Sequence, residues 1–372
     1  MRILANIHAL SSSGGIEQIV FQTSKELARR GHELDLLYVQ DGDLSEDYRS
    51  FCQSLTRVPT FNFARSNAAR DLARLVPAVR AGRRCRPDVI YISRFQEVTY
   101  GILTGWTSRA PVVCHLHYLT QHGPTRLMGR QVRRFIAVSE ATRREWIHAG
   151  LDPAWIEVIP NGIDPSKFTF GGAEERRRAR QTLGLPLDAF IALYCGRMSP
   201  EKGVEVLIDA WKQIGFDRRE GRLLLVGMPP EPSRIDVVAE YQRRLIDSAS
   251  ETCEWLPARR DVVPVMHAAD VVVVPSHYET FGLTALEAMA TGRPVIASKA
   301  GGLPEILDGS FEPFLFEDGD STALADHLRS LIGWQGTQPD LALACRGHVE
   351  ARFTLNSMVD AIQRVLLDAS LR

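Results

Sequence analysis

The sequence predicts an α/β protein of two domains, each built on a doubly wound parallel sheet. Short apolar segments alternate with stretches of helical periodicity along the whole chain, and these segments are apolar throughout rather than at every second residue. Parallel strands covered by helices on both faces have this character. The chain has 372 residues, which exceeds the size at which a single core keeps growing, so two domains are expected.

Six segments of the first half are predicted to be strands. A helix is expected after the first of them, beginning at about Ile16, because Ile19, Val20 and Leu27 recur at helical spacing. The predicted strands are 2–10, 33–39, 88–93, 111–117, 134–139 and 156–160.

The second half repeats the pattern with four predicted strands, which are 190–196, 222–227, 270–276 and 294–298. Val204, Leu207 and Trp211 indicate an amphipathic helix after the first of these strands, and a second helix is expected over 283–290. This alternation of strand and helix is typical of the doubly wound architecture.

The segment 161–185 interrupts the alternation with glycine, proline and charged residues, so it is expected to join the two domains. The first domain would then span 1–162 and the second 163–352, with an amphipathic helix at 353–372 that returns to the first. Two open sheets facing one another leave a cleft at the carboxyl ends of their strands, where folds of this kind bind ligands.

The composition is that of an ordinary globular protein, with 45% hydrophobic and 24% charged residues. No apolar run approaches the roughly 18 residues of a membrane-spanning helix, and the N-terminal segment is predicted to be a buried strand rather than a signal peptide. The six cysteines are scattered singly, which favours a reduced, cytoplasmic protein without a structural zinc site.

Eight arginines lie between Arg57 and Arg86, in a region otherwise poor in acidic residues. A solvated helix face explains them, and so does a surface that meets an anionic acceptor or an acidic membrane. Apolar side chains at helical spacing lie among these arginines over 72–79, which suits peripheral contact with lipid.

Two glycines, Gly14 and Gly15, stand where the first strand gives way to a helix. Glycine lets the backbone approach a phosphate closely, and the free N–H groups at a helix start attract negative charge. A plain turn is the alternative. The G-x-G-x-x-G fingerprint of dinucleotide-binding proteins is absent, which disfavours a nicotinamide enzyme.

Arg197 and Lys202 flank a loop near the start of the second domain. The preceding strand is expected to end at Cys195, and Gly196 to turn the chain toward the helix that begins at Val204. Two cations above a helix N-terminus suit a diphosphate and would stabilise negative charge on a leaving group. Solvent-exposed loop cations are the alternative.

The stretch 277–297 places two glutamates, Glu279 and Glu287, around the start of a helix. Glu279 would accept hydrogen bonds from sugar hydroxyls, and Glu287, a turn or more into the helix, would grip a vicinal diol such as a ribose. Free backbone N–H groups at the helix start would hold phosphate or hydroxyl oxygens, and they belong to Phe281, Gly282, Leu283 and Thr284. A sugar nucleotide, with two sugars and a central diphosphate, matches this arrangement.

These motifs resemble those of the retaining glycosyltransferases of family 4, which have the two-domain GT-B fold. The matching pieces are GGIEQ (14–18), VSEATRREW (138–146), IPNGID (159–164), GRMSPEKG (196–203) and ETFGLTALEAMATGRPVIASKAGGLPEI (279–306). They span most of the chain, and the last is highly specific.

The resemblance implies a role for each residue of the second domain named above. Arg197 and Lys202 would bind the donor diphosphate, with catalytic roles for both. Glu287 would hold the nucleotide ribose, and Glu279 would lie by the donor sugar as a further catalytic group. Backbone from 281 to 284 would complete the pocket.

Two residues of the first domain are also implied. Gly15 would approach the phosphates or the acceptor. In such enzymes a histidine after a strand of the first domain lies by the donor sugar's 6-hydroxyl, and the register of PVVCHLHYLT (111–120) points to His117 as this catalytic residue, with His115 as second choice. A structural histidine is the alternative.

The implied reaction is the transfer of a hexosyl group from a nucleotide diphosphate to a hydroxyl of a glycan, lipid-linked or small-molecule acceptor, with retention of configuration. A uridine diphosphate sugar is favoured as the donor, and guanosine diphosphate mannose comes next. No Asp-x-Asp element is expected at the end of a second-domain strand, so basic side chains rather than a metal would offset the diphosphate charge, and no cofactor is expected.

Two other functions remain as alternatives, a sugar-nucleotide epimerase of similar architecture and a non-catalytic sugar-nucleotide binder. The expected location is cytoplasmic, with peripheral contact at the inner face of a membrane through the basic region 57–86. Nucleic acid is not expected as a partner.

Overall fold

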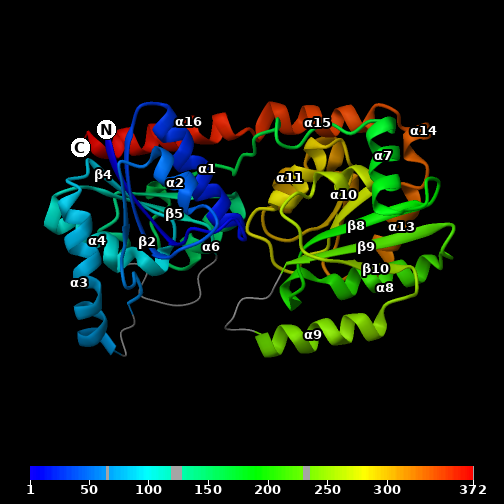
Figure 1. The fold of residues 1–372 in the computed structure, drawn as a ribbon, viewed down its shortest axis with the longest axis horizontal. Coiled ribbons are helices and arrows are strands. Elements are labelled where there is room, and N and C mark those ends of the chain that lie inside the picture. The colour runs from blue at the N-terminus through cyan, green and yellow to red at the C-terminus, as the bar shows by residue number, and fades with distance from the viewer. Residues whose placement is uncertain (64–66, 119–127, 229–234, 372) are drawn as a thin grey trace. The chain divides into compact units, whose positions relative to one another are not determined.

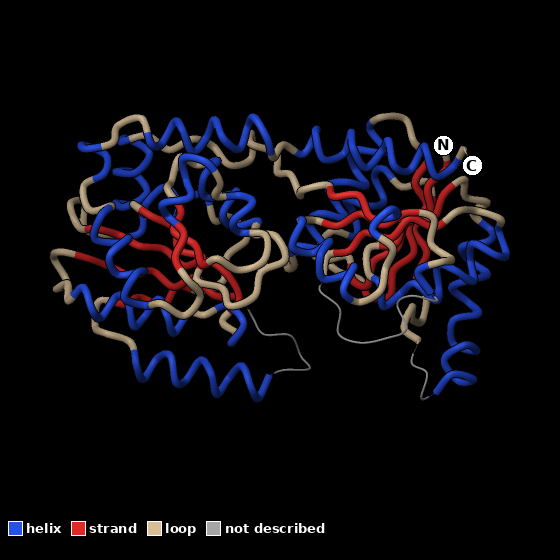
Figure 2. The backbone as a smooth tube through the Cα atoms, turned by 180° about the vertical axis from the view of Figure 1, so that it is seen from behind, coloured by secondary structure: helices blue, strands red, loops and turns tan. Residues whose placement is uncertain are grey.

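The structure is a computed structural model that describes residues 1–63, 67–118, 128–228 and 235–371. The chain divides into two compact units: unit 1 is Met1–Gly162 with Leu355–Arg372, and unit 2 is Ile163–Thr354. Each unit has one sheet with helices on both faces (Figures 1 and 2). Every pairing between its named strands is parallel, so the predicted fold class is confirmed.

Over the described residues, the sheet of unit 1 has the strand order β3-β2-β1-β4-β5-β6-β7. The direction of winding reverses beside β1, which is the mark of a doubly wound sheet. The strands are β1 (Arg2–Ala9), β2 (Glu33–Gln40), β3 (Ser54–Arg57), β4 (Val89–Ile92), β5 (Val112–Leu116), β6 (Arg134–Ala137) and β7 (Ile156–Val158).

The C-terminal helix of the chain belongs to unit 1 and lies beside its first helix, as Figure 1 shows. Arg30, the C-cap residue of that first helix, donates to the Asp360 carboxylate at 2.6 Å. The helices of this unit are α1 (Gly15–Arg29), α2 (Ser45–Phe51), α3 (Ala68–Arg84), α4 (Val98–Ser108), α6 (Glu140–His148) and α16 (Leu355–Ser370). Short 3-10 turns cover Phe95–Glu97 and Pro153–Trp155.

Unit 2 has the strand order β10-β9-β8-β11-β12-β13, with its reversal between β8 and β11. The central strands are rich in Val, Ile and Leu, and β11 and β12 are buried along their whole length, as strands covered on both faces are. They are β8 (Phe190–Arg197), β9 (Gly221–Met228), β10 (Cys253–Leu256), β11 (Val271–Val274), β12 (Val295–Ser298) and β13 (Leu315–Phe316).

Helices α8 and α9 lie on one face of this sheet, and α10 and α11 lie on the other (Figure 1). The longer helices are α7 (Ala173–Leu183), α8 (Val204–Ile214), α9 (Ile235–Ser248), α11 (Leu283–Ala290), α13 (Ser321–Ser330) and α15 (Leu341–Arg352). The shorter ones are α10 (Val263–Ala268), α12 (Leu303–Ile306) and α14 (Trp334–Thr337), with 3-10 turns at Pro200–Lys202 and Gly309–Phe314.

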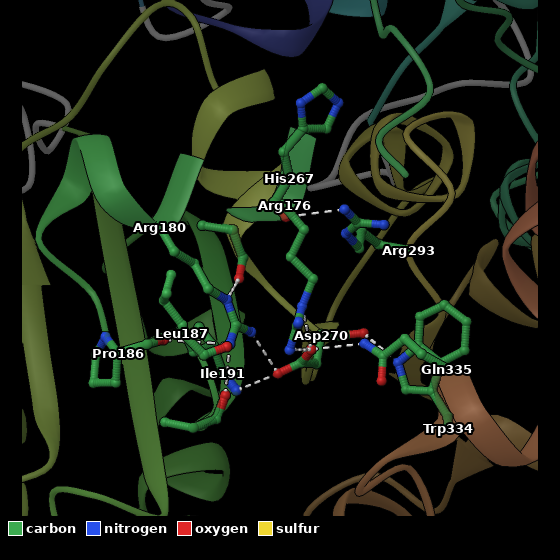
Figure 3. Close-up of polar contacts among 12 residues, drawn as sticks. Arg176, Arg180, Pro186, Leu187, Ile191, His267, Asp270, Arg293, Trp334 and Gln335 are labelled. Atoms are coloured by element: carbon green, nitrogen blue, oxygen red, sulfur yellow. Dashed lines mark hydrogen bonds and ion pairs between the residues drawn. The ribbon is translucent and has the colours of Figure 1, made fainter. Parts of the chain in front are cut away.

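A buried ionic network joins the amino ends of β8 and β11 to two helices (Figure 3). Asp270, directly before β11, accepts hydrogen bonds from Arg180 at 2.8 Å and from Arg176 at 2.7 Å. It also accepts from the backbone N–H of Ile191 at 2.7 Å and from Gln335 at 2.7 Å. Asp270 and Arg180 are almost fully buried, so each charge depends on the other.

Three predictions about elements were wrong in detail. Three strands were not predicted from the sequence: β3, β10 and β13, which lie toward the edges of their sheets and have two to four residues each. The expected joining segment 161–185 contains α7, which belongs to unit 2. Strand β8 continues past Cys195, because Gly196 and Arg197 keep their pairing with β9.

Among the helices of the described ranges, none has both the length and the apolarity that crossing a lipid bilayer requires.

Candidate functional site

Two loops of unit 2 meet at the carboxyl ends of adjacent strands. One follows β8 and the other follows β11, and the two strands pair directly in the sheet. Lys202 Nζ, in the first loop, donates to Glu279 Oε2, in the second, at 2.7 Å. Only 18% of the lysine side chain and 16% of the glutamate side chain are exposed. The structure therefore brings these two predicted residues together as a shielded ion pair.

Glycines allow the loops to pack at the level of the backbone. Gly203 has a φ of +60°, and a Cβ there would lie 2.1 Å from the Pro275 carbonyl oxygen. Gly301 has a φ of +52°, and a Cβ there would lie 1.6 Å from the Glu279 carbonyl oxygen. Any larger side chain at these positions would displace the loop that carries Glu279.

Helix α11 begins directly after the second loop, and its bounds match the prediction. Gly282 is its N-cap, with a φ of +117° and no side-chain cap, so the N–H groups of Leu283 and Thr284 have no acceptor within the helix. Phe281 is buried and packs edge-to-face on Phe353. The start of α11 therefore offers free backbone N–H groups, and the buried Phe281 side chain holds this turn in place.

The same helix start lies against the end of β8. Thr284 Oγ1 donates to the Cys195 carbonyl oxygen at 3.5 Å. Arg197, the last residue of β8, is 37% exposed and lies 3.8 Å from the Glu201 carboxylate. The arginine, the Lys202–Glu279 pair and the first turn of α11 therefore occupy one end of the sheet.

Glu287 lies one turn into α11 and is half-buried. Burial raises the pKa of its carboxyl to about 7. Its side chain has no hydrogen-bond or ion-pair partner within the described ranges. A carboxylate so placed is stabilised by donors from a ligand, such as the two hydroxyls of a diol.

Gly15 and His117 belong to unit 1, whereas the other predicted site residues belong to unit 2. Gly15 is the exposed first residue of α1. His117 directly follows β5 and is buried, and its ring lies 3.9 Å from that of His115 between centroids. Burial, assisted by the charge of Arg94, lowers the His117 pKa to about 3, so its imidazole is neutral at physiological pH.

Near the switch point of the unit 1 sheet lies a polar cluster that was not predicted from the sequence. Arg94, two residues past the end of β4, donates to Glu17 of α1 at 2.6 Å. Glu97 is buried and accepts from Asn6 Nδ2 at 2.5 Å, and burial raises its pKa to about 7. The available signal was the presence of two charged residues just after a buried strand.

One expectation about metal ligands was wrong. Asp318-Gly319-Asp320 follows β13 almost directly, so an Asp-x-Asp element does end a strand of the second unit. This element was not expected because a strand of only two residues is not predicted from the sequence. Both carboxylates have protein partners: Asp318 bonds to His277 at 2.6 Å, and Asp320 caps α13 through the N–H groups of Thr322 and Ala323.

Comparison with known families gives two matches. Residues 13–167 match the model described as "Glycosyltransferase Family 4", and residues 189–333 match "Glycosyl transferases group 1". The D-inositol 3-phosphate glycosyltransferase of Corynebacterium efficiens is 29% identical over 356 residues, which are 87% of this chain and 83% of that protein. The lipopolysaccharide 1,2-N-acetylglucosaminetransferase of Salmonella typhimurium is 38% identical over 189 residues, 49% of each chain.

Solved structures share the fold over nearly the whole chain. The Anabaena protein HepE, in complex with UDP and glucose, has a TM-score of 0.84 at 24% identity and covers 99% of this chain and 100% of its own. The sucrose-phosphate synthase of Thermosynechococcus elongatus has a TM-score of 0.80 at 25% identity, with 98% of each chain covered. Taken with the two parallel sheets and the matched motifs, these findings show that the chain is a glycosyltransferase of family 4 with the GT-B fold.

Proposed function

We propose that this enzyme transfers a hexosyl group from a UDP-sugar to an acceptor hydroxyl, with retention of the anomeric configuration. The observation that carries the proposal is that Glu279, paired with Lys202, belongs to the loop before α11, and that Glu287, which has no partner among the described residues, belongs to α11 itself. HepE, a protein of the same fold, was solved with UDP and glucose and with UDP-glucose. A uridine nucleotide is therefore favoured over guanosine diphosphate mannose.

In this proposal the diphosphate takes Arg197, Lys202 and the backbone N–H groups of 281–284 as its donors. The ammonium of Lys202 exchanges part of its contact with Glu279 for a phosphate oxygen, and Glu279 then accepts from hydroxyls of the transferred sugar. Glu287 holds the ribose diol. Positive charge and helix-start dipoles stabilise the leaving diphosphate, so the protein contributes positioning and electrostatics.

The proposed reaction needs no divalent metal. Arg197 and Lys202 supply the charge that a metal would otherwise supply to the diphosphate. Turnover should be unchanged by EDTA and by added magnesium, and loss of activity on chelation would contradict this part of the proposal.

His117 is proposed to accept or donate one hydrogen bond at the donor sugar as a neutral imidazole, which agrees with its lowered pKa. Gly15, at the start of α1, is proposed to lie near the phosphates or the acceptor. Both roles require unit 1 to contribute to the reaction.

The test is an assay of UDP release with candidate UDP-sugars, with and without acceptor, combined with NMR of the product's anomeric centre. Transfer with retention supports the proposal. An epimerised donor would indicate an epimerase, binding without turnover would indicate a sugar-nucleotide binder, and either would contradict it. Lys202→Ala should lower kcat/KM by about 10²-fold or more, since it removes a charge-assisted contact to the leaving group.

A phosphate-bearing or lipid-linked acceptor is proposed from the charge of α3. Arg70, Arg74 and Arg80 are exposed on this helix, with Leu72 and Val76 exposed between them. Residues 64–66 of the basic region, including Arg65, lie outside the described residues. One relative acts, by its name, on D-inositol 3-phosphate, which carries such a phosphate.

The same helix is proposed to contact an anionic membrane surface. Co-sedimentation with vesicles of anionic and neutral lipid, at low and high salt, tests this. We expect retention on anionic vesicles at low salt only, and its loss in the triple variant R70E/R74E/R80E. Failure of the wild-type protein to sediment with either vesicle would contradict membrane contact.

A further inference from the structure

His277 lies two residues before Glu279 and joins three segments that are far apart in the sequence. Its Nδ1 is 2.6 Å from Asp318 Oδ1, in the turn after β13, and its Nε2 is 2.9 Å from Glu205 Oε1, in the first turn of α8. Both ring nitrogens therefore face carboxylate oxygens. Since a carboxylate accepts hydrogen bonds, each nitrogen must carry a proton for both contacts to be bonds, which requires the imidazolium form.

The electrostatics agree with this geometry. Partial burial acts to lower the His277 pKa, but the hydrogen bonds to Glu205 and Asp318 outweigh it and raise the pKa above its ordinary value. Glu205 is fixed from its other side by the Tyr241 hydroxyl of α9. The imidazolium is thus held between two carboxylates, one of which is itself anchored.

The ring also lies near the loop that carries Lys202. A Cβ at Gly203 would lie 3.4 Å from His277 Nε2, and the N–H of Tyr278 donates to the Glu201 carbonyl oxygen at 3.2 Å. The residues on either side of this contact, Lys202 and Glu279, form the shielded ion pair of the candidate site. Any movement of His277 would therefore shift both loops.

We propose that His277 is a positioning residue, whose imidazolium ties the loop after β11 to α8 and to the turn after β13 and so sets Lys202 and Glu279 for the sugar nucleotide. The inference rests on the proposed function, because it assigns His277 a part in donor binding. The groups that face the ring or its partners are Glu205, Asp318 and Tyr241, with the Lys202–Glu279 pair next to it in the same two loops. Deprotonation of the ring would remove one of its two hydrogen bonds and leave a ring lone pair facing a carboxylate oxygen.

The experiment measures the affinity for UDP-glucose by calorimetry at pH 6.0 and pH 8.5, in the wild type, in His277→Gln and in His148→Gln. UDP-glucose is the probe because its diphosphate does not titrate in this range. His148 is an exposed histidine of α6 in unit 1, which makes the same substitution a matched control. Glu287 titrates in this range as well, so the comparison is between proteins at each pH.

At pH 6.0 we expect His277→Gln to bind UDP-glucose about tenfold more weakly than the wild type, because one charge-assisted clamp is lost. At pH 8.5 the difference should be smaller, since the wild-type ring loses its proton, and with it one of the two contacts, as the pH rises above the His277 pKa. His148→Gln should match the wild type at both values. Equal weakening of His277→Gln at both pH values, or no weakening at either, would overturn the inference.

A second measurement does not depend on whether His277→Gln folds. In histidine-labelled wild-type protein, the NMR titration of His277 should give a pKa above 6.5, and Asp318→Asn, which keeps the imidazole, should lower it. A His277 pKa at or below 6.5 would overturn the inference while leaving the proposed function intact. A wild type that binds no UDP-glucose at either pH contradicts the proposed function, and the inference falls with it.

Discussion

The Glu287 carboxyl is half-buried on α11 and has no partner within the described ranges, and its pKa is raised by burial from 4.5 to about 7. In the unfolded chain the group ionises near pH 4.5, whereas in the folded chain it keeps its proton to about pH 7. The unfolded state therefore binds fewer protons between these values, and the stability contributed by this group falls as pH rises through that window. Above pH 7 the cost of the buried charge is fully present.

The variant Glu287→Gln removes this cost and also removes the proposed ribose contact. At pH 8 we expect it to be more stable than the wild type by up to about 3 kcal/mol, with no gain at pH 4.5. Its affinity for UDP-glucose should fall about 10- to 100-fold, since a carboxylate accepts from a diol more strongly than an amide does. Urea unfolding at the two pH values and calorimetry are the measurements. A variant that is no more stable at pH 8, or that binds donor as the wild type does, contradicts the assignment.

The contribution of His117 to stability changes with pH in the opposite direction. Its pKa is lowered from 6.5 to about 3, so the unfolded chain binds a proton between these values that the folded chain does not. Stability from this group is present above pH 6.5 and is lost as pH falls toward 3.

His117→Asn should therefore lose about 2 kcal/mol less stability than the wild type between pH 7 and pH 5. It should also lower kcat by about tenfold or more, because the proposed contact at the donor sugar is weakened. His148→Asn, at an exposed site, is the control for both measurements. If His117→Asn keeps full turnover, the residue is structural.

At the scale of elements, there is a physical reason why some strands are predicted from the sequence and others are not. Strand β11 is Val-Val-Val-Val and fully buried, so its composition alone predicts it. In β3, Ser-Leu-Thr-Arg, three of the four residues are polar, and β13 has two residues, because an edge strand needs neither continuous apolar character nor length. Missing β13 also hid the Asp-x-Asp turn that follows it.

The candidate site likewise has features that the local sequence predicts and features that it does not. Helix α11 and the glutamates before and within it follow from local sequence, since the turn, the helix formers and the acids are contiguous. The His277 contacts do not, because Glu205 reaches it only through the pairing of β8 with β11, and Asp318 only through the pairing of β11 with β12 and of β12 with β13. Local patterns predict elements, whereas contacts between side chains of different elements require the register of the sheet.

The hydrogen bonds and ion pairs of Asp270 are expected to stabilise the amino ends of β8 and β11 in unit 2. Replacing Asp270 by Asn leaves Arg180 buried without its counter-charge, so we expect a loss of about 3–5 kcal/mol in the free energy of unfolding. Glu350→Gln, which breaks an exposed pair with Arg346 within one helix, should cost less than about 0.5 kcal/mol. Urea unfolding of both variants checks this, and similar losses in the two would refute the network's role.

The close approach of Gly301 to Glu279 can be separated from the cost of its backbone conformation. Gly301→Ala and Gly333→Ala both place alanine at positive φ, but only the first has an obstructing carbonyl oxygen, since nothing lies within 4 Å of a Cβ at Gly333. We expect about 1 kcal/mol of destabilisation for Gly333→Ala and at least twice that for Gly301→Ala. Only Gly301→Ala should also weaken UDP-glucose binding. Equal behaviour of the two variants would show that the loop contact has no consequence.

At the scale of the whole molecule, each unit has its own buried core, and the chain passes from unit 1 to unit 2 and back. Ligand that binds only one folded unit stabilises that unit by mass action. The proposed donor contacts lie mostly in unit 2, so UDP-glucose should raise the melting temperature of this unit more than that of unit 1.

Truncation after Thr354 is expected to unfold unit 1 and to leave unit 2 folded. Helix α16 buries Met358, Val359, Ile362, Val365 and Leu366 in unit 1. At about 1.5–3 kcal/mol for each buried side chain, their removal costs about 8–15 kcal/mol, which is comparable to the roughly 5–15 kcal/mol that holds a typical domain together. We expect calorimetry of the truncated chain to lose the unit 1 transition and to keep a unit 2 transition that UDP-glucose still raises. A chain that ends at Ser370 is the control and should melt as the full chain does. If the truncated chain kept both transitions, α16 would not be part of the unit 1 core. If it lost both transitions, unit 2 would depend on unit 1 for its fold.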